Sequence, residues 1–259
     1  MNISRADKVL LGGGTAVLGG SALFGVPLGF AVPAAALAAV MLDGIFRPTS
    51  SVFYPTIAHG PRDQPQVALT FDDGPDPAVT PAVLDILGAA DARGTFFTIG
   101  RYLQRHAAIG QRIVDERHEL GNHSWQHSRL QNFYGPRAHT EDLARNTSII
   151  QKLTGSDREP LYRPPVGLKS PALARVATRR ELTIVAWSLH SRDTVIRDPR
   201  AVAARVLRKI QPGDIVLLHD GHDIEGARRH VVLDALPLIL DGLRQQGLQA
   251  TTVSELLRR

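Results

Sequence analysis

Short apolar runs alternate with longer amphipathic stretches from about residue 60 to the end of the chain. The amphipathic stretches predict helices, several with proline at an early position, at 78–91, 138–153, 199–210 and 229–246. The apolar runs predict β-strands at residues 66–71, 94–99, 160–163, 182–188, 214–219 and 248–252. Strands that alternate with helices form a mainly parallel sheet covered by helices. The pattern therefore predicts an α/β fold, either doubly wound or closed into a barrel.

The chain before this region has a different composition. Residues 9–42 contain no charged side chain and consist mainly of small and aliphatic residues. A membrane-spanning helix needs roughly 20 apolar residues, so the segment is long for one span and short for two. The sequence at 25–27, Gly-Val-Pro, offers a turn for a hairpin of two short helices. We expect a retained anchor that contacts membrane lipid through residues 9–42. A cleaved signal peptide, with Arg5 and Lys8 as its basic start, is the alternative.

The change in composition also suggests a domain organisation. We expect a membrane segment at 1–46, a linker at 47–62 and a catalytic domain at 63–259, anchored to the inner or plasma membrane. The basic start of the chain favours a cytoplasmic N-terminus. A single span would then place the domain outside, whereas a hairpin would leave it in the cytoplasm, and the sequence leaves both topologies open.

The chain has no cysteine, which excludes disulfides, thiolate metal ligands and cysteine nucleophiles. Any metal must therefore be held by His, Asp or Glu. The net charge of +5 and the isoelectric point near 10 fit an anionic membrane surface or a polyanion. No basic run is interleaved with aromatic residues, so we expect no nucleic-acid partner.

Two adjacent carboxylates, Asp72 and Asp73, follow the first predicted strand in the sequence Thr-Phe-Asp-Asp-Gly-Pro at 70–75. Neighbouring residues on a strand point to opposite faces, so the two carboxylates can share one site only where the strand ends. A surface turn capped by an Asp is the alternative reading of this hexapeptide.

Two histidines, His123 and His127, are four residues apart, a spacing that places both imidazoles on one face of a helical turn. Two His and one carboxylate, with positions left for water and substrate, are typical of a catalytic metal site. Either Asp72 or Asp73 could supply this carboxylate, and the other would remain free as a base. The carboxyl ends of strands carry the chemistry in both α/β architectures. Further polar clusters follow predicted strands at 163–167, 187–193 and 217–222.

These motifs resemble the polysaccharide deacetylase family, also called the NodB-homology domain, over roughly residues 60 to 258. The chain shares with it, in order, T-F-D-D-G-P, H-S-x-x-H, R-P-P-x-G, the Trp187-to-Asp193 stretch and L-L-H-D. The resemblance implies an irregular (β/α) barrel. It also implies an enzyme that removes N-acetyl or O-acetyl groups from a carbohydrate with one divalent metal, commonly Zn²⁺.

The resemblance assigns roles at the metal end of the site. Asp72 would be the general base that takes a proton from the attacking water. Asp73 would join His123 and His127 as a metal ligand. Arg163 would pair with Asp72 and hold it ionised and oriented.

The resemblance also assigns the remaining groups. His219 would be the general acid that protonates the leaving amine, and Asp193 would keep it protonated. The backbone N–H of Val166 would stabilise the oxyanion, although the family often has Tyr at this position. The expected substrate-binding residues are Pro165, Trp187 and His190.

The substrate and two alternative functions remain open at this point. His190 stands where an Asp is frequent and Thr194 where a Trp is common, and both changes line the sugar site. Peptidoglycan, chitin-like oligomers, an acetylated envelope polysaccharide and a lipid-linked sugar are all compatible. Another metal hydrolase, such as a phosphoesterase, would need more ligands for a second metal. A non-catalytic membrane-anchored sugar-binding protein would be expected to lack Asp72 or His219, and both are present.

Overall fold

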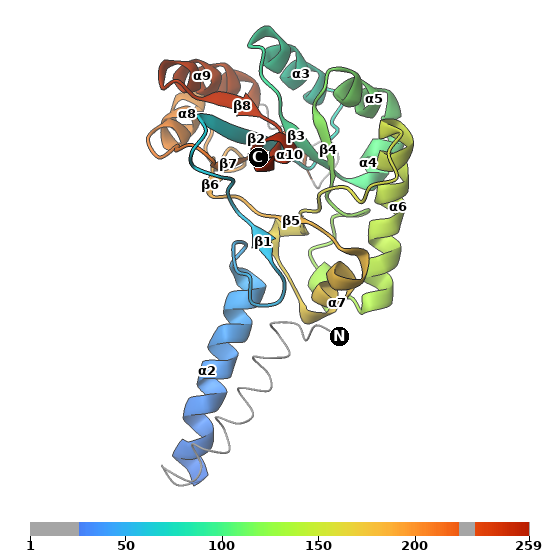
Figure 1. The fold of residues 1–259 in the computed structure, drawn as a ribbon, viewed down its shortest axis with the longest axis vertical. Helices are drawn as coiled ribbons and strands as arrows, with labels where there is room; N and C mark the ends of the chain where they lie inside the picture. Colours follow the sequence, from blue (N-terminus) through green and yellow to red (C-terminus); the bar gives the residue numbers. More distant parts are fainter. Residues whose placement is uncertain (1–25, 223–230, 259) are drawn as a thin grey trace.

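The computed structural model describes residues 26–222 and 231–258. A long helix, α2 (Val26–Phe46), projects from an α/β domain that holds the other elements (Figure 1). Half of the predicted membrane segment, residues 9–25, lies outside the described residues, and the other half belongs to α2. Within the described part of the chain, no helix has both the length and the apolar character needed to cross a bilayer.

The domain is built on one parallel sheet with the strand order β4-β3-β2-β7-β6. The central strand β2 pairs with β7 along one edge and with β3 and β8 along the other. The strands are β2 (Gln66–Asp72), β3 (Thr95–Thr98), β4 (Glu119–Asn122), β6 (Leu189–His190), β7 (Ile215–His219) and β8 (Gln249–Thr251).

The parallel pairings continue beyond the sheet edges and form a ring. Strand β5 (Ile184–Val185) pairs with β1 (Thr56–Ile57), and Tyr162 forms bridges to both Asn122 of β4 and Ile184 of β5. Because β5 leads directly into β6, the segment 184–190 contacts Tyr162 at its start and β7 at its end. The pairings therefore close into a ring, but short strands and isolated bridges make this ring irregular, as expected for an irregular (β/α) barrel.

Helices surround this ring, and several begin at prolines, which lack the N–H that a first helical turn leaves unpaired. Helices α6, α7 and α8 each have Pro as their first residue, and Ser170 and Asp198 cap the last two. The helices are α3 (Thr80–Ala89), α4 (Gly100–Arg105), α5 (Ala107–Asp115), α6 (Pro136–Thr154), α7 (Pro171–Arg180), α8 (Pro199–Leu207), α9 (Val231–Gln245) and α10 (Val253–Leu257).

Most predicted elements are confirmed, and two predicted strands are wrong in detail. Residues 160–163 form only the isolated bridges of Tyr162, because Pro160 and Pro164 on either side lack the N–H that a strand ladder needs. The predicted strand 182–188 is divided between β5 and β6. Strand β4 was not predicted, and neither were β1 and helices α4, α5, α7 and α10.

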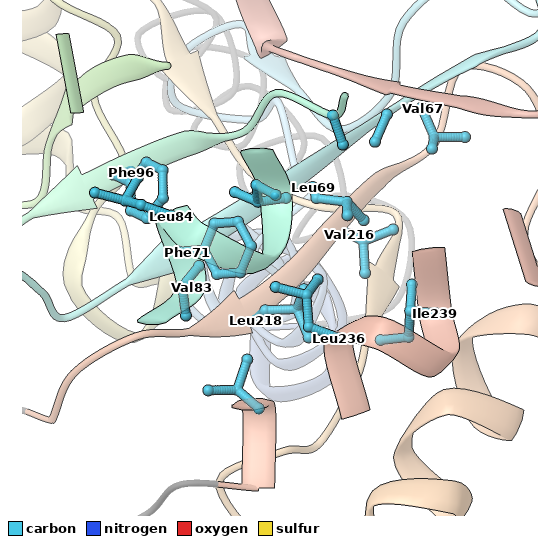
Figure 2. Packing of buried hydrophobic residues seen from close by; sticks show 14 of the residues in the cluster. Val67, Leu69, Phe71, Val83, Leu84, Phe96, Val216, Leu218, Leu236 and Ile239 are labelled. Carbon is cyan, nitrogen blue, oxygen red and sulfur yellow. The ribbon is translucent and has the colours of Figure 1, made fainter. Parts of the chain in front are cut away.

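The main hydrophobic core lies between the outer face of the sheet and the covering helices. Alternate residues of β2, namely Val67, Leu69 and Phe71, face outward and are fully buried. Figure 2 shows them against side chains of α3 and α9, among them Leu84 and Leu236. Full burial of one such side chain stabilises the fold by about 1.5–3 kcal/mol.

The opposite face of β2 points into the barrel and leads to the polar end. Ala68 packs there with Phe97, Ile215 and the α10 residues Val253 and Leu256, which fill the amino end of the barrel. The same alternation places Thr70 and Asp72 inward, toward the carboxyl end. His219 of β7 is the register partner of Asp72. The two side chains therefore meet at the end of the barrel that α10 does not fill.

Candidate active site

The adjacent carboxylates share one site because the chain turns sharply between them. Asp72 is the last residue of β2, and Asp73 has a φ of 74°, in the left-handed region. His123 Nε2 lies 3.6 Å from Asp72 Oδ2 and 3.5 Å from Asp73 Oδ1. The turn continues through Gly74, where a Cβ would lie 2.3 Å from Asp220 Oδ2. Glycine is therefore required where this turn passes the Asp220 carboxylate.

The three residues expected to hold a metal lie together. Ligand atoms of Asp73, His123 and His127 all fall within 4.8 Å of one another, and all three residues are well shielded from solvent. Asp73 Oδ1 is 3.5 Å from His123 Nε2 and 3.3 Å from His127 Nε2. One cation placed among these atoms would meet two nitrogens and one carboxylate oxygen.

The expected helical turn between the two histidines is wrong, although their convergence is correct. Residues 123–128 form a loop after β4, with positive φ at Ser124 (70°) and His127 (54°). The Ser124 hydroxyl accepts a hydrogen bond from the His127 N–H at 2.9 Å. The Trp125 N–H donates to Asp142 Oδ1 of α6 at 2.9 Å. A hydrogen-bonded loop, not helical periodicity, brings His127 beside His123.

The surroundings of His123 fit a metal ligand. Its Nδ1 lies 2.7 Å from the Arg163 carbonyl oxygen, which can only accept, so Nδ1 carries the proton and Nε2 presents a lone pair. Burial lowers the pKa of His123 to about 3, so the ring is neutral at physiological pH. A neutral imidazole oriented by a carbonyl is the usual state of a metal-binding histidine. The donor set of two imidazoles and one carboxylate suits a divalent metal such as Zn²⁺.

The expected pairing of Arg163 with Asp72 is confirmed. Arg163 is fully buried inside the barrel, and its Nη1 donates to Asp72 Oδ1 at 2.6 Å and to Thr70 Oγ1 at 2.8 Å. Its Nη2 donates to the Ala186 carbonyl at 3.0 Å, and the guanidinium lies 4.0 Å from the Phe97 ring centre. These contacts fix Asp72 through Oδ1 and leave Oδ2 facing the metal cluster.

His219 is held by Asp193, also as expected. Asp193 Oδ1 accepts from His219 Nδ1 at 2.9 Å, and Oδ2 accepts from the His219 backbone N–H at 2.7 Å. Ser191 Oγ donates to the same carboxylate at 2.8 Å. Burial alone would lower the pKa of His219, but the Asp193 carboxylate, together with the nearby Asp73 and Asp72, outweighs it and raises this pKa to about 9. His219 is therefore an imidazolium at neutral pH, with Nε2 available to donate.

The loop that carries Val166 has an unusual backbone. Val166 has a φ of 57°, which is rare for a β-branched residue and costs about 1–3 kcal/mol. Its side chain is 55% exposed, and the N–H groups of Gly167 and Leu168 donate to carbonyls within the turn. The backbone, not the valine side chain, is the constrained feature, which agrees with an oxyanion role for the N–H.

The three expected substrate-binding residues have different surroundings. Trp187 and His190 are half-buried, and their ring centres are 6.0 Å apart. The His190 ring centre lies 6.3 Å from that of His219, so His190 lies beside the expected general acid. Pro165 is buried and lines a small internal cavity with Tyr162, so its ring lies beneath the loop.

No role was predicted for Asp220, whose side chain supports the turn at Asp73. Thr80 Oγ1 donates to Asp220 Oδ2 at 2.6 Å, and the carboxylate packs against Gly74. Burial raises the pKa of Asp220 to about 7. Its position directly after His219 in L-L-H-D was the signal that could have indicated this role.

No role was predicted for Lys169 either. This residue joins the loop that carries Val166 to the end of α2. Its side chain is buried, and its ammonium donates to the carbonyls of Pro48 and Ser50, the latter at 2.7 Å. Its backbone N–H donates to the Ile45 carbonyl of α2 at 3.3 Å. Residues 47–62, expected as a linker, thus include β1 and these buried contacts.

Replacing Lys169 with Met should lower the free energy of unfolding, because the carbonyls of Pro48 and Ser50 would lose their donor. Each buried acceptor left unpaired costs about 1–3 kcal/mol. Urea unfolding of the full chain in detergent measures the change. Lys209→Met is the matched control, because Lys209 is exposed on the surface. Equal stability of the two variants would contradict a structural role for Lys169.

Comparison with known proteins agrees with the site geometry. Residues 59–185 match the family described as "Polysaccharide deacetylase". The peptidoglycan-N-acetylglucosamine deacetylase of Bacillus cereus is 37% identical over 76% of this chain and 91% of its own length. The chain belongs to the polysaccharide deacetylase family. The chitooligosaccharide deacetylase of Azorhizobium caulinodans is 31% identical over 72% of this chain and 91% of its own length.

Solved structures support the same family fold. A CE4 family pseudoenzyme from Bacillus anthracis superposes with a TM-score of 0.68 at 25% identity, covering 78% of this chain and 69% of that one. The predicted α/β fold of the NodB type is confirmed, and so is the predicted carbohydrate deacetylase. Since this fold also occurs in a pseudoenzyme, the complete set of site residues carries the catalytic interpretation for the deacetylase described here.

Proposed function

We propose that this deacetylase removes the N-acetyl group from N-acetylglucosamine units of an envelope glycan, with one Zn²⁺ held by Asp73, His123 and His127. The observation that carries this proposal is the placement of Asp72 and His219 side by side on neighbouring strands next to the metal cluster, each fixed by its own partner. Relatives named as peptidoglycan and chitooligosaccharide deacetylases support an N-acetylated amino sugar as substrate.

Asp72 acts as the general base in this mechanism. When bound, the metal supplies a Lewis acid that polarises the acetyl carbonyl and makes a nearby water more acidic. Asp72 Oδ2 accepts the proton of the attacking water, since Oδ1 is engaged by Arg163. Arg163 keeps the carboxylate oriented and compensates its charge inside the barrel.

His219 completes the reaction as general acid. Its Nδ1 is held by Asp193, so the proton on Nε2 is the one donated to the leaving nitrogen. Protonation of this nitrogen allows the C–N bond to break, which releases acetate and a free amine. The Val166 N–H donates to the oxygen that becomes negatively charged when water adds to the carbonyl.

Removal of the metal should abolish acetate release. We expect full-length protein treated with a chelator to lose activity on chitooligosaccharides and peptidoglycan fragments, and added Zn²⁺ to restore it. Asp73→Ala should weaken Zn²⁺ binding by at least about 10-fold, measured by competition with a chromogenic chelator. Acetate release that persists in metal-free protein would rule out the proposed chemistry, and metal binding without acetate release on any glycan would favour a non-catalytic sugar-binding role.

We further propose that residues 9–42 anchor the protein in the membrane. The segment has no charged residue, and the described part of α2 leaves Val32 and Leu42 more than half exposed. Helix α2 also stands away from the domain in Figure 1. A spin label at residue 32 should show lipid-like relaxation in vesicles if this segment is an anchor.

A further inference from the structure

Most large exposed hydrophobic side chains on the domain lie in loops that also carry site residues. Outside α2, five described residues of this kind are exposed, and only Leu238 of α9 lies elsewhere. The other four lie in the loops that follow β4, Tyr162 and β6 and that carry site residues. We call these four the mouth rim: Leu130, Phe133, Val166 and Val195. Phe133 is 85% exposed and Val195 is 76% exposed.

Part of the mouth rim lies level with the end of α2. The Lys169 N–H donates to Ile45 of α2, and the Lys169 carbonyl accepts from Asn132 Nδ2 at 3.1 Å. Phe133 directly follows Asn132. Gly167, next to Val166, lies against Pro48, where a Cβ would approach the proline ring to 2.8 Å. Val166 is therefore one residue away from a contact to Pro48, and Phe133 is one residue away from a contact to Lys169, which itself binds the segment 45–48.

The first charged residues of α2 indicate where this helix would leave a bilayer, close to the segment 45–48. Moving along α2 from the uncharged segment 9–42, the first charges are Asp43 and Arg47, which form an ion pair of 2.8 Å. A membrane helix leaves the hydrocarbon where charged residues begin. The loops that carry the mouth rim also expose three arginines, which would favour anionic headgroups: Arg129, Arg192 and Arg197.

The junction at Lys169 makes this arrangement rigid. A buried ammonium bound to Pro48 and Ser50, together with Phe53 packed against Gly44 and Ala174, joins α2 to the domain without a free tether. In Figure 1, α7, which follows the loop that carries Val166, lies at the end of the domain from which α2 projects. The orientation of the mouth relative to α2 is therefore fixed by packed contacts.

We propose that the mouth rim rests in the headgroup layer of the bilayer that α2 enters. The active site then opens on the membrane surface and receives an acetylated amino sugar attached to a lipid. This inference rests on the membrane anchoring proposed above. Apolar side chains of interfacial segments reach about 5–10 Å into the headgroup and acyl boundary, a depth available to Phe133 and Val195.

Site-directed spin labels can test this directly, because the natural chain has no cysteine. Single-cysteine variants Phe133→Cys and Val195→Cys of the full chain are labelled in vesicles of phosphatidylcholine and phosphatidylglycerol in equal parts. Val32→Cys reports on the anchor, and Leu238→Cys is the control on the domain surface. A water-soluble nickel chelate relaxes spin labels that are exposed to water, and we expect this at position 238. We expect the labels at 133 and 195 to show much less of this relaxation, because the bilayer shields them.

The outcomes separate the two membrane proposals. Lipid-like relaxation at 32 with water-like relaxation at 133 and 195 would overturn the mouth-rim proposal and leave the anchor intact. Water-like relaxation at 32 would overturn the anchor and, with it, the docked rim. Acetate release from soluble chitooligosaccharides, measured on the same samples, tests the deacetylase proposal independently of both.

A kinetic experiment tests the substrate part. Phe133→Ser should lower kcat/KM several-fold more for a vesicle-embedded lipid bearing an N-acetylglucosamine oligomer than for the soluble oligomer. Leu238→Ser is the matched control, because Leu238 is an exposed aliphatic residue outside the rim, and it should change neither value. An equal effect of Phe133→Ser on both substrates would overturn the preference for a membrane-bound sugar.

Discussion

Asp72→Asn is expected to lower kcat by about 10²–10⁴-fold while Zn²⁺ remains bound. The amide oxygen can still accept from Arg163, but the side chain can no longer take the proton of the attacking water. The metal ligands Asp73, His123 and His127 are unchanged. Steady-state acetate release and the zinc content of the purified protein measure the two effects separately.

Two controls keep this result interpretable. Asp72→Asn leaves the buried Arg163 charge without a carboxylate, which destabilises the fold, so the melting temperature must exceed the assay temperature. Asp73→Asn should instead lose bound Zn²⁺, because Asp73 is the proposed carboxylate ligand. If Asp72→Asn lost the metal and Asp73→Asn kept it, the two carboxylates would have to exchange roles. The exposed Asp241 provides a neutral Asp→Asn comparison.

Asp193→Asn should move the falling limb of the pH–rate profile to lower pH. In the wild type, Asp193, together with Asp73 and Asp72, raises the pKa of His219 to about 9, so the acid is protonated below this pH and activity falls above it. Without the carboxylate, the imidazole returns toward its ordinary pKa of about 6.5 or below. At pH 8 the protonated fraction, and with it kcat, should fall by up to about 30-fold, because Asp73 and Asp72 still favour the imidazolium. Measurement of kcat/KM and kcat from pH 5 to pH 10 tests this.

Protein stability offers a second readout for the same variant. A histidine whose pKa is raised by folding contributes stability that is complete below its unfolded pKa, about 6.5, and is lost as pH rises through about 9. Wild-type stability should therefore decline over this window by more than that of Asp193→Asn. A falling limb that does not move would remove Asp193 from the mechanism and leave it a structural partner of the loop.

The sequence predicted the strands that carry Asp72 and His219, because β2 and β7 are mainly apolar runs. It missed β4, whose residues Glu119 to Asn122 include only one large apolar side chain, Leu120. Yet β4 positions His123, so a strand without an apolar signature supplies a metal ligand. Tyr162 was placed in a strand because its apolar neighbours outweighed the flanking prolines. Local composition could not show that one bridging residue would suffice to continue the ring.

The site residues were predicted more completely than their supports. His123 and His127 were found by residue type and spacing, although the reason given for them, a helical turn, is wrong, and Asp73 was assigned by the family resemblance. Their convergence depends on positive φ angles at Ser124 and His127, which are non-glycine residues with no turn signature. Lys169 acts through partners about 120 positions earlier in the chain, and no sequence spacing predicts such a contact.

The junction between α2 and the domain also decides where the catalytic unit begins. The family match starts at residue 59, but Phe53 is buried and Lys169 takes its acceptors from residues 48 and 50. A fragment cut at residue 59 would retain a buried ammonium without these oxygens and expose the surface that Phe53 covers. Because the Lys169 N–H also donates to the Ile45 carbonyl, the smallest self-contained domain includes the last turn of α2, so the helix that we propose enters the membrane also completes the catalytic domain.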